Sequence, residues 1–363
     1  MLGTDFGLAQ QPGFLATADY YLHGIGPSGY YFNYSDCGRG GTGLAPAMFW
    51  FAAQRQQPHL LWHEWTKLTA AAPDDRRSGR ARDRTEPMLL LWMSRTQGQP
   101  TTPPPALSWT GQGPVPVAFH RSAWTRDASF VALKGGSPSA NHAHMDVGAF
   151  VMDADGVRWA DDLGMQDYNS LESAGINLWG KSQDAERWKV FRLGTSAHNV
   201  LMIDGQQQRV DGHAPIVFST TGRTVVDLAR LYRGQLAEAR RGVALLPDRT
   251  VVVQDEFTAA GKSVGARWAM VTHADVKIDG FGRATLSQAG KKLEFRVLEP
   301  AATPLEIYPT DPPPAPTDAR NPGTRLIGFE VSVAAGMSQR IVVQLVPAST
   351  TAAPLVVRPL AQW

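Results

Sequence analysis

Three residues that can bind a metal ion or carry a proton lie close together in the middle of the chain. His142, His144 and Asp146 fall within the stretch N-H-A-H-M-D, just ahead of an apolar run. Asp162 follows after one predicted hairpin, and His198 stands at the start of another apolar run. Alternate residues of a strand face the same side, so the first three would project together if this stretch were extended. Imidazole and carboxylate donors without a thiolate suit zinc or another divalent first-row metal.

Two assignments of a metal site fit this spacing. In the first, His144, Asp162 and His198 are the ligands, which leaves His142 free for proton transfer. In the second, His144 and Asp146 join a later histidine, either His198 or His213. That set would form the triad of two histidines and a carboxylate found in non-haem iron oxygenases. Spacing alone does not separate the two assignments.

The composition limits the classes of protein to consider. The chain has 363 residues, enough for one large domain or two, and its hydrophobic content of 43% is ordinary for a globular protein. The formal net charge is +2, so no global charge predicts binding to nucleic acid or to an anionic membrane. No apolar run reaches the length of a membrane helix. Cys37 is the single cysteine, which excludes an internal disulfide and a cysteine-rich metal site.

The first part of the chain, residues 1–98, is predicted to be helical. Apolar residues at helical spacing indicate helices over residues 44–57, 58–71 and 86–94. Between the last two helices, residues 74–84 are expected to form a solvated loop of mixed charge. Residues 99–116, which are rich in proline and glycine, are predicted to be a linker.

The remainder, residues 117–363, is predicted to form a large antiparallel sandwich. Short runs rich in β-branched and aromatic residues alternate with turn signals such as D-A-D-G at 153–156. About ten of these runs are predicted strands, among them V-A-F-H-R, F-V-A-L-K, N-V-L-M-I-D and R-I-V-V-Q-L-V. A proline-rich stretch at 309–323 is expected to be a loop between two strands. Helices followed by a β part give an α+β fold class.

Two long motifs in the central part are specific enough to compare with known families. The first reads K-G-G-x-x-x-x-N-H-A-H-M-D-V-G-A-F-x-x-D-x-x-G-V-R-W-A-D-D-L-G, and the second R-W-K-V-F-R-L-G-T-S-A-H-N-V-L. Together they resemble the heparinase II/III family of polysaccharide lyases, which includes alginate and oligo-alginate lyases. The match is dense over Ala118–Gln208 and thinner over Gly29–Trp65. The resemblance implies an incomplete (α/α) toroid, of which residues 1–98 would be a remnant, followed by an antiparallel β-sandwich.

The resemblance also implies roles for single residues. The position that matches the family's sandwich-side catalytic histidine is His142, with Asn141 directly before it. The positions that match the zinc ligands are His144, Asp162 and His198. In this family the zinc is regarded as structural and lies near the cleft, so we expect Zn²⁺ as a structural cofactor. The resemblance therefore favours the first of the two assignments.

A uronate lyase imposes further requirements. It removes the proton at C5 of a uronic acid and expels the oxygen linked at C4, so it needs a base, an acid and donors that neutralise the carboxylate. In the family a tyrosine commonly serves as base or acid, and Tyr168 is the candidate because it follows the predicted metal-ligand turn. Arg187, Arg192 and Tyr34 are the candidate substrate-binding residues. Structural ion pairs and packing are the competing roles for these side chains.

The predicted function is therefore cleavage of uronic-acid-containing polysaccharides by β-elimination. The expected partner is an acidic polysaccharide or oligosaccharide, with neither nucleic acid nor membrane, and a homodimer is compatible with this function. Family relatives are periplasmic or secreted, and no signal peptide is recognisable.

The beginning of the chain departs from the family pattern. The family's toroid normally supplies an Asn-His pair and a tyrosine ahead of the segment that here reads G-P-S-G-Y-Y-F-N-Y and begins at Gly26. We therefore expect an N-terminally truncated chain. The alternative function is a non-catalytic, zinc-stabilised β-domain that binds carbohydrate or serves a structural role.

Overall fold

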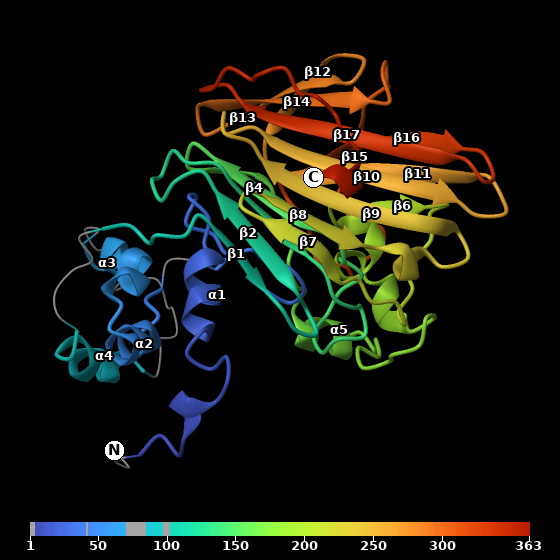
Figure 1. The fold of residues 1–363 in the computed structure, drawn as a ribbon. Coiled ribbons are helices and arrows are strands. Elements are labelled where there is room, and N and C mark those ends of the chain that lie inside the picture. Colours follow the sequence, from blue (N-terminus) through green and yellow to red (C-terminus); the bar gives the residue numbers. More distant parts are fainter. Residues whose placement is uncertain (1–3, 41–42, 70–84, 97–101) are drawn as a thin grey trace.

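The computed structural model describes residues 4–40, 43–69, 85–96 and 102–363, which form a small helical part and a large β part (Figure 1). The helices are α1 (Thr17–His23), α2 (Ala47–Arg55), α3 (Trp62–Thr69), α4 (Glu86–Met93) and α5 (Tyr168–Ser173). Short 3-10 turns lie at Leu8–Gln10, Pro58–Leu61, Glu186–Lys189, Phe191–Leu193, Thr195–Ala197, Ala229–Tyr232 and Leu360–Gln362. None of the described helices is long and apolar enough to cross a membrane.

The predicted helices are confirmed where the structure describes them, as α2, as α3 with the 3-10 turn before it, and as α4. Pro46 stands at the N-cap of α2, and Gln56 ends that helix in a left-handed conformation (φ 54°). The sequence does not predict α1, because seven residues are too few to show a helical period. The end of the second predicted helix, the charged loop at 74–84 and the boundary between residues 98 and 99 lie outside the described residues.

The β part contains strands in three sheets within the described residues. They are β1 (Ser108–Gly111), β2 (Val117–Arg121), β3 (Phe130–Lys134), β4 (Phe150–Ala154), β5 (Val157–Ala160), β6 (Leu201–Ile203), β7 (Ile216–Thr220), β8 (Arg223–Asp227), β9 (Leu236–Leu245), β10 (Val251–Ala259), β11 (Val264–Thr272), β12 (Asp275–Gly280), β13 (Arg283–Gln288), β14 (Lys291–Glu299), β15 (Glu306–Pro309), β16 (Arg325–Val333) and β17 (Ser338–Pro347). The sheets have the orders β1-β2-β3-β4-β5, β12-β13-β14-β17-β10-β9-β8-β7 and β15-β16-β11-β6. Every pairing between these strands is antiparallel, as the sequence predicts.

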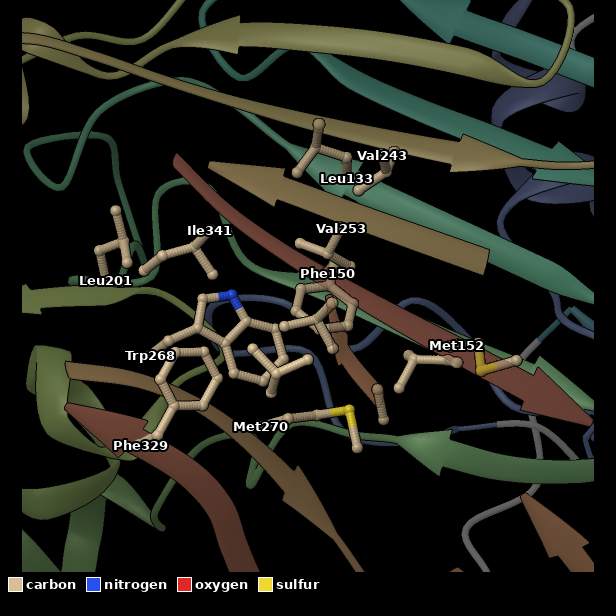
Figure 2. Packing of buried hydrophobic residues seen from close by; sticks show 14 of the residues in the cluster. Leu133, Phe150, Met152, Leu201, Val243, Val253, Trp268, Met270, Phe329 and Ile341 are labelled. Carbon is tan, nitrogen blue, oxygen red and sulfur yellow. The ribbon is translucent and has the colours of Figure 1, made fainter. Parts of the chain in front are cut away.

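The main core lies where the three sheets face one another. Figure 2 shows Leu133 of the five-stranded sheet, Val253 of the eight-stranded sheet and Trp268 of the four-stranded sheet in one cluster. The fully buried ring of Trp268 stacks on Phe329, with ring centroids 5.8 Å apart and an interplanar angle of 12°. Phe150 approaches the same indole at 6.0 Å. Because Phe150 begins β4, this packing also fixes the end of the segment that carries the predicted site.

Two sequence predictions about the β part are corrected. The predicted linker 99–116 contains strand β1, whose Ser108 pairs with His120 of β2. The stretch with His142, His144 and Asp146 is an irregular loop between β3 and β4, so strand alternation does not place these side chains. The structure also has more strands than the pattern predicts. Strand β9 reads L-A-E-A-R-R-G-V-A-L, and its charged residues hide the apolar alternation on which the prediction depends.

His120 links two sheets through neutral hydrogen bonds. Its Nδ1 lies 2.8 Å from the hydroxyl of Ser108 on β1, and its Nε2 lies 2.8 Å from the hydroxyl of Thr224 on β8. Burial lowers the pKa of His120 from 6.5 to about 4. The neutral imidazole is therefore part of the folded state, whereas the unfolded chain takes up a proton already near pH 6.5.

We predict that the free energy of unfolding falls as the pH is lowered from about 6.5 to about 4, because the unfolded state then binds the additional proton. For His120 alone the loss is on the order of 3 kcal/mol once the pH lies below both pKa values. Desolvation also lowers the pKa of the buried His23 and of the half-buried His63, so both add to the slope. Thermal unfolding measured across this pH range should show a shallower slope in a His120→Gln variant. An identical slope in the two proteins would contradict the assignment.

Candidate active site

The irregular loop between β3 and β4 is fixed by buried contacts. Asp146 forms an ion pair with Lys134 and accepts a hydrogen bond of 2.8 Å from the Ser35 N–H. Burial acts to raise the pKa of Asp146, but the charges of Lys134, His198 and His144, together with the Lys134 hydrogen bond, outweigh it and lower that pKa to about 2. Gln208 brackets Val147, accepting from its N–H at 3.1 Å and donating to its carbonyl at 2.8 Å. These bonds satisfy backbone groups that no sheet pairs, so the loop can hold a site in one conformation.

The Asp36 carboxylate brings His142 and Tyr168 together. Its Oδ2 lies 2.8 Å from His142 Nδ1 and accepts a hydrogen bond from the Tyr168 hydroxyl, which is 3.0 Å from the same Nδ1. The imidazole and phenol rings stack, with centroids 6.1 Å apart and planes 9° apart. The His142 side chain is 53% exposed. Its other nitrogen, Nε2, makes none of the hydrogen bonds found among the described residues, so it is free to meet a ligand.

His142 has an unusual backbone conformation. Its φ is 59°, in the left-handed region that few non-glycine residues occupy. The Asp36 N–H donates to the His142 carbonyl at 3.3 Å, so one residue contacts both the backbone and the imidazole of His142. Backbone strain of this kind gathers at functional sites. The outlier is thus independent support for a functional role of this histidine.

The charges within this group define the protonation states. Burial acts to raise the pKa of Asp36, but hydrogen bonds from His144 and Tyr168 outweigh it and lower that pKa. Burial and the neighbouring Asp36 carboxylate raise the pKa of Tyr168, so its phenol is protonated at neutral pH. An ionised carboxylate only accepts hydrogen bonds. His142 therefore donates to Asp36 through Nδ1, and Nε2 is the ring nitrogen that Asp36 does not contact.

Sequence reasoning did not find Asp36. It is separated from His142 by 106 positions, and local patterns carry no information about such a pairing. Asp36 does lie in the segment Y-F-N-Y-S-D, where the family resemblance is thinner. The resemblance of that segment to the family was the one signal in the sequence that pointed to Asp36.

The other two histidines are fully buried and lie next to each other. His144 Nε2 is 2.9 Å from Asp36 Oδ1, and His198 Nδ1 is 2.6 Å from Asp162 Oδ2. The two imidazole centroids are 5.4 Å apart. The remaining nitrogens, His144 Nδ1 and His198 Nε2, are buried without a hydrogen-bond partner. Buried polar atoms are rarely left unpaired, and a bound cation would satisfy both.

The structure brings the three predicted zinc ligands together, with a difference in the role of Asp162. Its Oδ2 contacts the Nδ1 side of His198, and its Oδ1 accepts from the Gly164 N–H at 2.8 Å. A carboxylate bonded to the far nitrogen of a metal-bound imidazole orients that ring. Among the described residues no group of three histidine, cysteine, aspartate or glutamate side chains has the arrangement of a metal site. Zinc binding stays a prediction.

Two nearby aspartates have other partners. Asp146 is bound to Lys134, which argues against the triad with Asp146 as an iron ligand. Asp161 accepts from Arg39 at 2.6 Å and pairs with Arg158 at 3.3 Å. Arg158 in turn donates to the carbonyl of Tyr31 at 3.0 Å. This second, buried ionic cluster therefore ties the segment before Asp36 to the five-stranded sheet.

The comparison with known families agrees with this geometry. The family model described as heparinase II/III-like, C-terminal, matches residues 112–334, which is more than half of the chain. The chain belongs to the heparinase II/III-like family. The resemblance predicted from the two central motifs is thus confirmed, and the matched range contains the histidines at 142, 144 and 198. No curated protein is detectably similar to the chain in sequence.

Solved structures of heparinase-type lyases have the same fold as this heparinase II/III-like chain. Heparan sulfate lyase HepC from Pedobacter heparinus is 15% identical, with a TM-score of 0.61 over 93% of this chain and 47% of its own. A heparinase III gene product is 15% identical, with a TM-score of 0.62 over 94% and 48%. Another heparinase III structure is 14% identical, with a TM-score of 0.54 over 93% and 57%. The chain thus spans about half the length of these structures. They confirm the antiparallel β-sandwich, while the helical part as a toroid remnant stays a prediction.

The two predicted arginines of this heparinase II/III-like chain are engaged by the protein itself. Arg187 is buried and donates to the Ala143 carbonyl at 2.8 Å, directly behind His142. Arg192 donates to Asn321 Oδ1 at 2.8 Å, and its other two nitrogens donate to the carbonyls of Met165 and Arg320. These bonds favour structural roles, and substrate binding by either arginine stays a prediction.

The last two predicted residues differ in their surroundings. Asn141 is exposed beside His142, and its amide makes none of the hydrogen bonds found in the described part of the chain. The Tyr34 hydroxyl lies 2.9 Å from that of Tyr20, and its ring packs edge-on against Phe32 at 5.0 Å. The role of Asn141 beside His142 therefore stays a prediction, whereas Tyr34 is held by packing.

Proposed function

We propose that this heparinase II/III-like protein cleaves uronic-acid-containing polysaccharides by β-elimination. The observation that supports the proposal is the pairing of the exposed His142 with the half-buried Tyr168 through the Asp36 carboxylate. A base and an acid at one point are the two groups that β-elimination requires. An ordinary surface histidine needs neither a half-buried carboxylate partner nor a left-handed backbone.

The proposed step assigns each proton. His142 Nε2 takes the proton from C5, the electrons of that bond form the C4=C5 double bond, and the bond from C4 to its glycosidic oxygen breaks. The Tyr168 hydroxyl, protonated because of its raised pKa, gives its proton to the departing oxygen. The Asp36 carboxylate stabilises the imidazolium that forms, as an aspartate does for a histidine base in other enzymes. Asp36 is thus a positioning residue and does not touch the substrate.

The uronate carboxylate must also be neutralised, because the C5 proton is otherwise too weakly acidic. The exposed amide of Asn141 is the donor next to His142 that can reach such a group. Arg187 lies behind the loop, and its charge acts on Tyr168 and Asp36. Asn141 is therefore proposed as the substrate contact and Arg187 as an electrostatic support.

The test is the ultraviolet absorbance of the unsaturated product. Alginate, heparin, heparan sulfate and hyaluronan would each be incubated with the protein, and we expect a rise in absorbance with at least one of them. Binding to the same polymers would be measured in parallel. If the protein binds a polymer but none of the polymers yields unsaturated product, the lyase function is rejected. The alternative function, a non-catalytic carbohydrate-binding domain, would then be supported.

We further propose that a divalent cation, zinc by the chemistry of its donors, binds at His144 and His198. The two buried, unpaired imidazole nitrogens fit such an ion. Asp162 would either bind the ion or orient His198, to which it is hydrogen-bonded. When bound, the ion would supply structural cross-linking between the loop after β3 and the segment before β6. The proposed proton transfers do not pass through it.

Removal of either imidazole should abolish this metal binding. We predict that the purified protein contains about one zinc per chain, and that His144→Gln and His198→Gln contain much less. A chelator should lower the unfolding temperature of the parent protein but not of these variants, because the parent alone loses a bound ion. His142→Asn is the matched control and should retain the metal. Equal zinc content in all four proteins would contradict the site.

A further inference from the structure

An exposed tryptophan lies next to the His142–Tyr168 pair. Trp179 is 55% exposed, and its ring meets that of Tyr168 edge-on, with centroids 5.5 Å apart and planes 86° apart. Tyr168 in turn stacks on His142. The three rings are therefore contiguous, and the indole extends the surface of the candidate active site beyond the acid and the base. The proton transfers described above leave it without a role.

The position of Trp179 is well defined although its ring is exposed. Its indole Nε1 donates to Glu172 Oε1 at 3.0 Å, and its backbone N–H donates to Asn177 Oδ1 at 3.0 Å. The Asn177 N–H is held by Glu186 at 2.9 Å, and Leu178 is buried. A large ring fixed in this way offers contact area to a ligand at little entropic cost. The exposed indole thus offers a preformed surface to a ligand bound at the His142–Tyr168 pair.

The chemistry around the indole restricts what it can bind. A flat aromatic face packs against the C–H groups of a pyranose ring, so the neighbour of the reacting uronate in a polysaccharide is a suitable occupant. Glu172 is the charged group in direct contact with the indole. Its carboxylate would repel a second uronate or a sulfated ring, whereas it can accept a hydrogen bond from a hydroxyl or an amide N–H.

We infer that Trp179 and Glu172 form a subsite for an uncharged sugar ring adjacent to the uronate at His142 and Tyr168. The inference rests on the proposed function for the position of that uronate. It selects polymers in which uronate alternates with an uncharged sugar, such as an N-acetylhexosamine. Trp179 provides the stacking surface, and Glu172 both orients the indole and excludes a negative charge.

The experiment measures binding in a His142→Asn background, so that the ligand is not consumed. The probes are two tetrasaccharides, one of alternating glucuronate and N-acetylglucosamine and one of mannuronate alone, with dissociation constants from titration calorimetry. Trp179→Ala should weaken binding of the alternating probe roughly tenfold, as loss of a stacked aromatic anchor does, and Trp179→Phe should weaken it less. Glu172→Gln retains an acceptor for the indole but removes the charge. It should strengthen binding of the mannuronate probe without a comparable gain for the alternating one.

Phe281→Ala is the matched control, because Phe281 is an exposed aromatic (70%) in the turn between β12 and β13. It should leave both dissociation constants unchanged. The subsite is overturned if neither probe binds, if Trp179→Ala has no effect, or if Glu172→Gln shifts both probes equally. Lyase activity with binding that is insensitive to Trp179 would remove the subsite and keep the proposed function. Binding that depends on Trp179, without formation of unsaturated product, would support the subsite and contradict the proposed lyase function.

Discussion

Replacing His142 with asparagine is expected to lower the rate of β-elimination by roughly 10²- to 10⁴-fold, the usual contribution of a general acid or base. Asparagine has no group that can take up the C5 proton at neutral pH. It does adopt left-handed backbone conformations more readily than most residues, so the φ of 59° at this position can be kept. The side chain is 53% exposed, and its removal leaves no cavity in the core. The effect should therefore fall on catalysis and not on stability.

The measurement is kcat/KM from product absorbance, together with the unfolding temperature. His59→Asn, in the 3-10 turn before α3, provides the same exchange in the helical part and should change neither quantity. A kcat/KM for His142→Asn within twofold of the parent value would remove His142 from the mechanism. A large loss of unfolding temperature would instead mean that its contacts with Asp36 are structural.

The parts of this molecule that the sequence predicts are those encoded locally. Apolar residues repeat along each predicted helix with the helical period, which a short stretch of sequence is enough to show. The hairpin at 153–156 pairs β4 with β5 and so brings Asp162 back toward His144. The family resemblance adds long-range information, because it joins N-H-A-H-M-D to S-A-H-N-V-L, and the structure places His144 and His198 of these two segments 5.4 Å apart. These features explain why the fold class and the grouping of His144, Asp162 and His198 could be predicted.

The parts that the sequence does not predict depend on contacts between distant segments. Asp36 contacts His142 although 106 positions separate them in the sequence, and Glu172 contacts Trp179 across a turn that has no periodic pattern. The loop that carries His142 resembles a strand in its alternation of residue types. It is bent into an irregular path because Lys134, Ser35 and Gln208 offer its polar groups better partners than a neighbouring strand would. Such partners become visible only in three dimensions.

The largest loss of stability from a single substitution is expected at the buried pair of Arg241 and Asp255. The guanidinium donates to both carboxylate oxygens, at 2.8 and 3.0 Å, and both side chains are buried in the core. Trp268 Nε1 donates to the same carboxylate at 3.1 Å. Asp255→Ala would leave the Arg241 cation without its counter-ion away from water. We expect the free energy of unfolding to fall by about 3–5 kcal/mol.

Denaturation by urea would measure the loss, and a surface pair provides the comparison. Arg340 and Glu299 form a hydrogen-bonded pair at 2.6 Å in which each side chain is 33% exposed. Glu299→Ala should cost about 0–1 kcal/mol, because solvent replaces the partner of an exposed charge. An equal loss of unfolding free energy in Asp255→Ala and Glu299→Ala would mean that burial does not determine how much each ion pair contributes to stability.

A double variant can separate stability from positioning. Arg241 Nη1 donates to the carbonyls of Gly148 and Asn199, at 2.9 and 2.6 Å, which lie beside the segments that carry His144 and His198. Combining Arg241→Met with Asp255→Leu replaces the ion pair by an apolar pair of similar volume, which should recover much of the lost stability. The carbonyls of Gly148 and Asn199 would lack their donor once Arg241 is replaced, so zinc content and lyase rate should fall below those of the parent protein. A stable double variant with full activity would show that the ion pair is not needed to position the site. A stable but inactive one would show that this core interaction positions the two segments that carry His144 and His198.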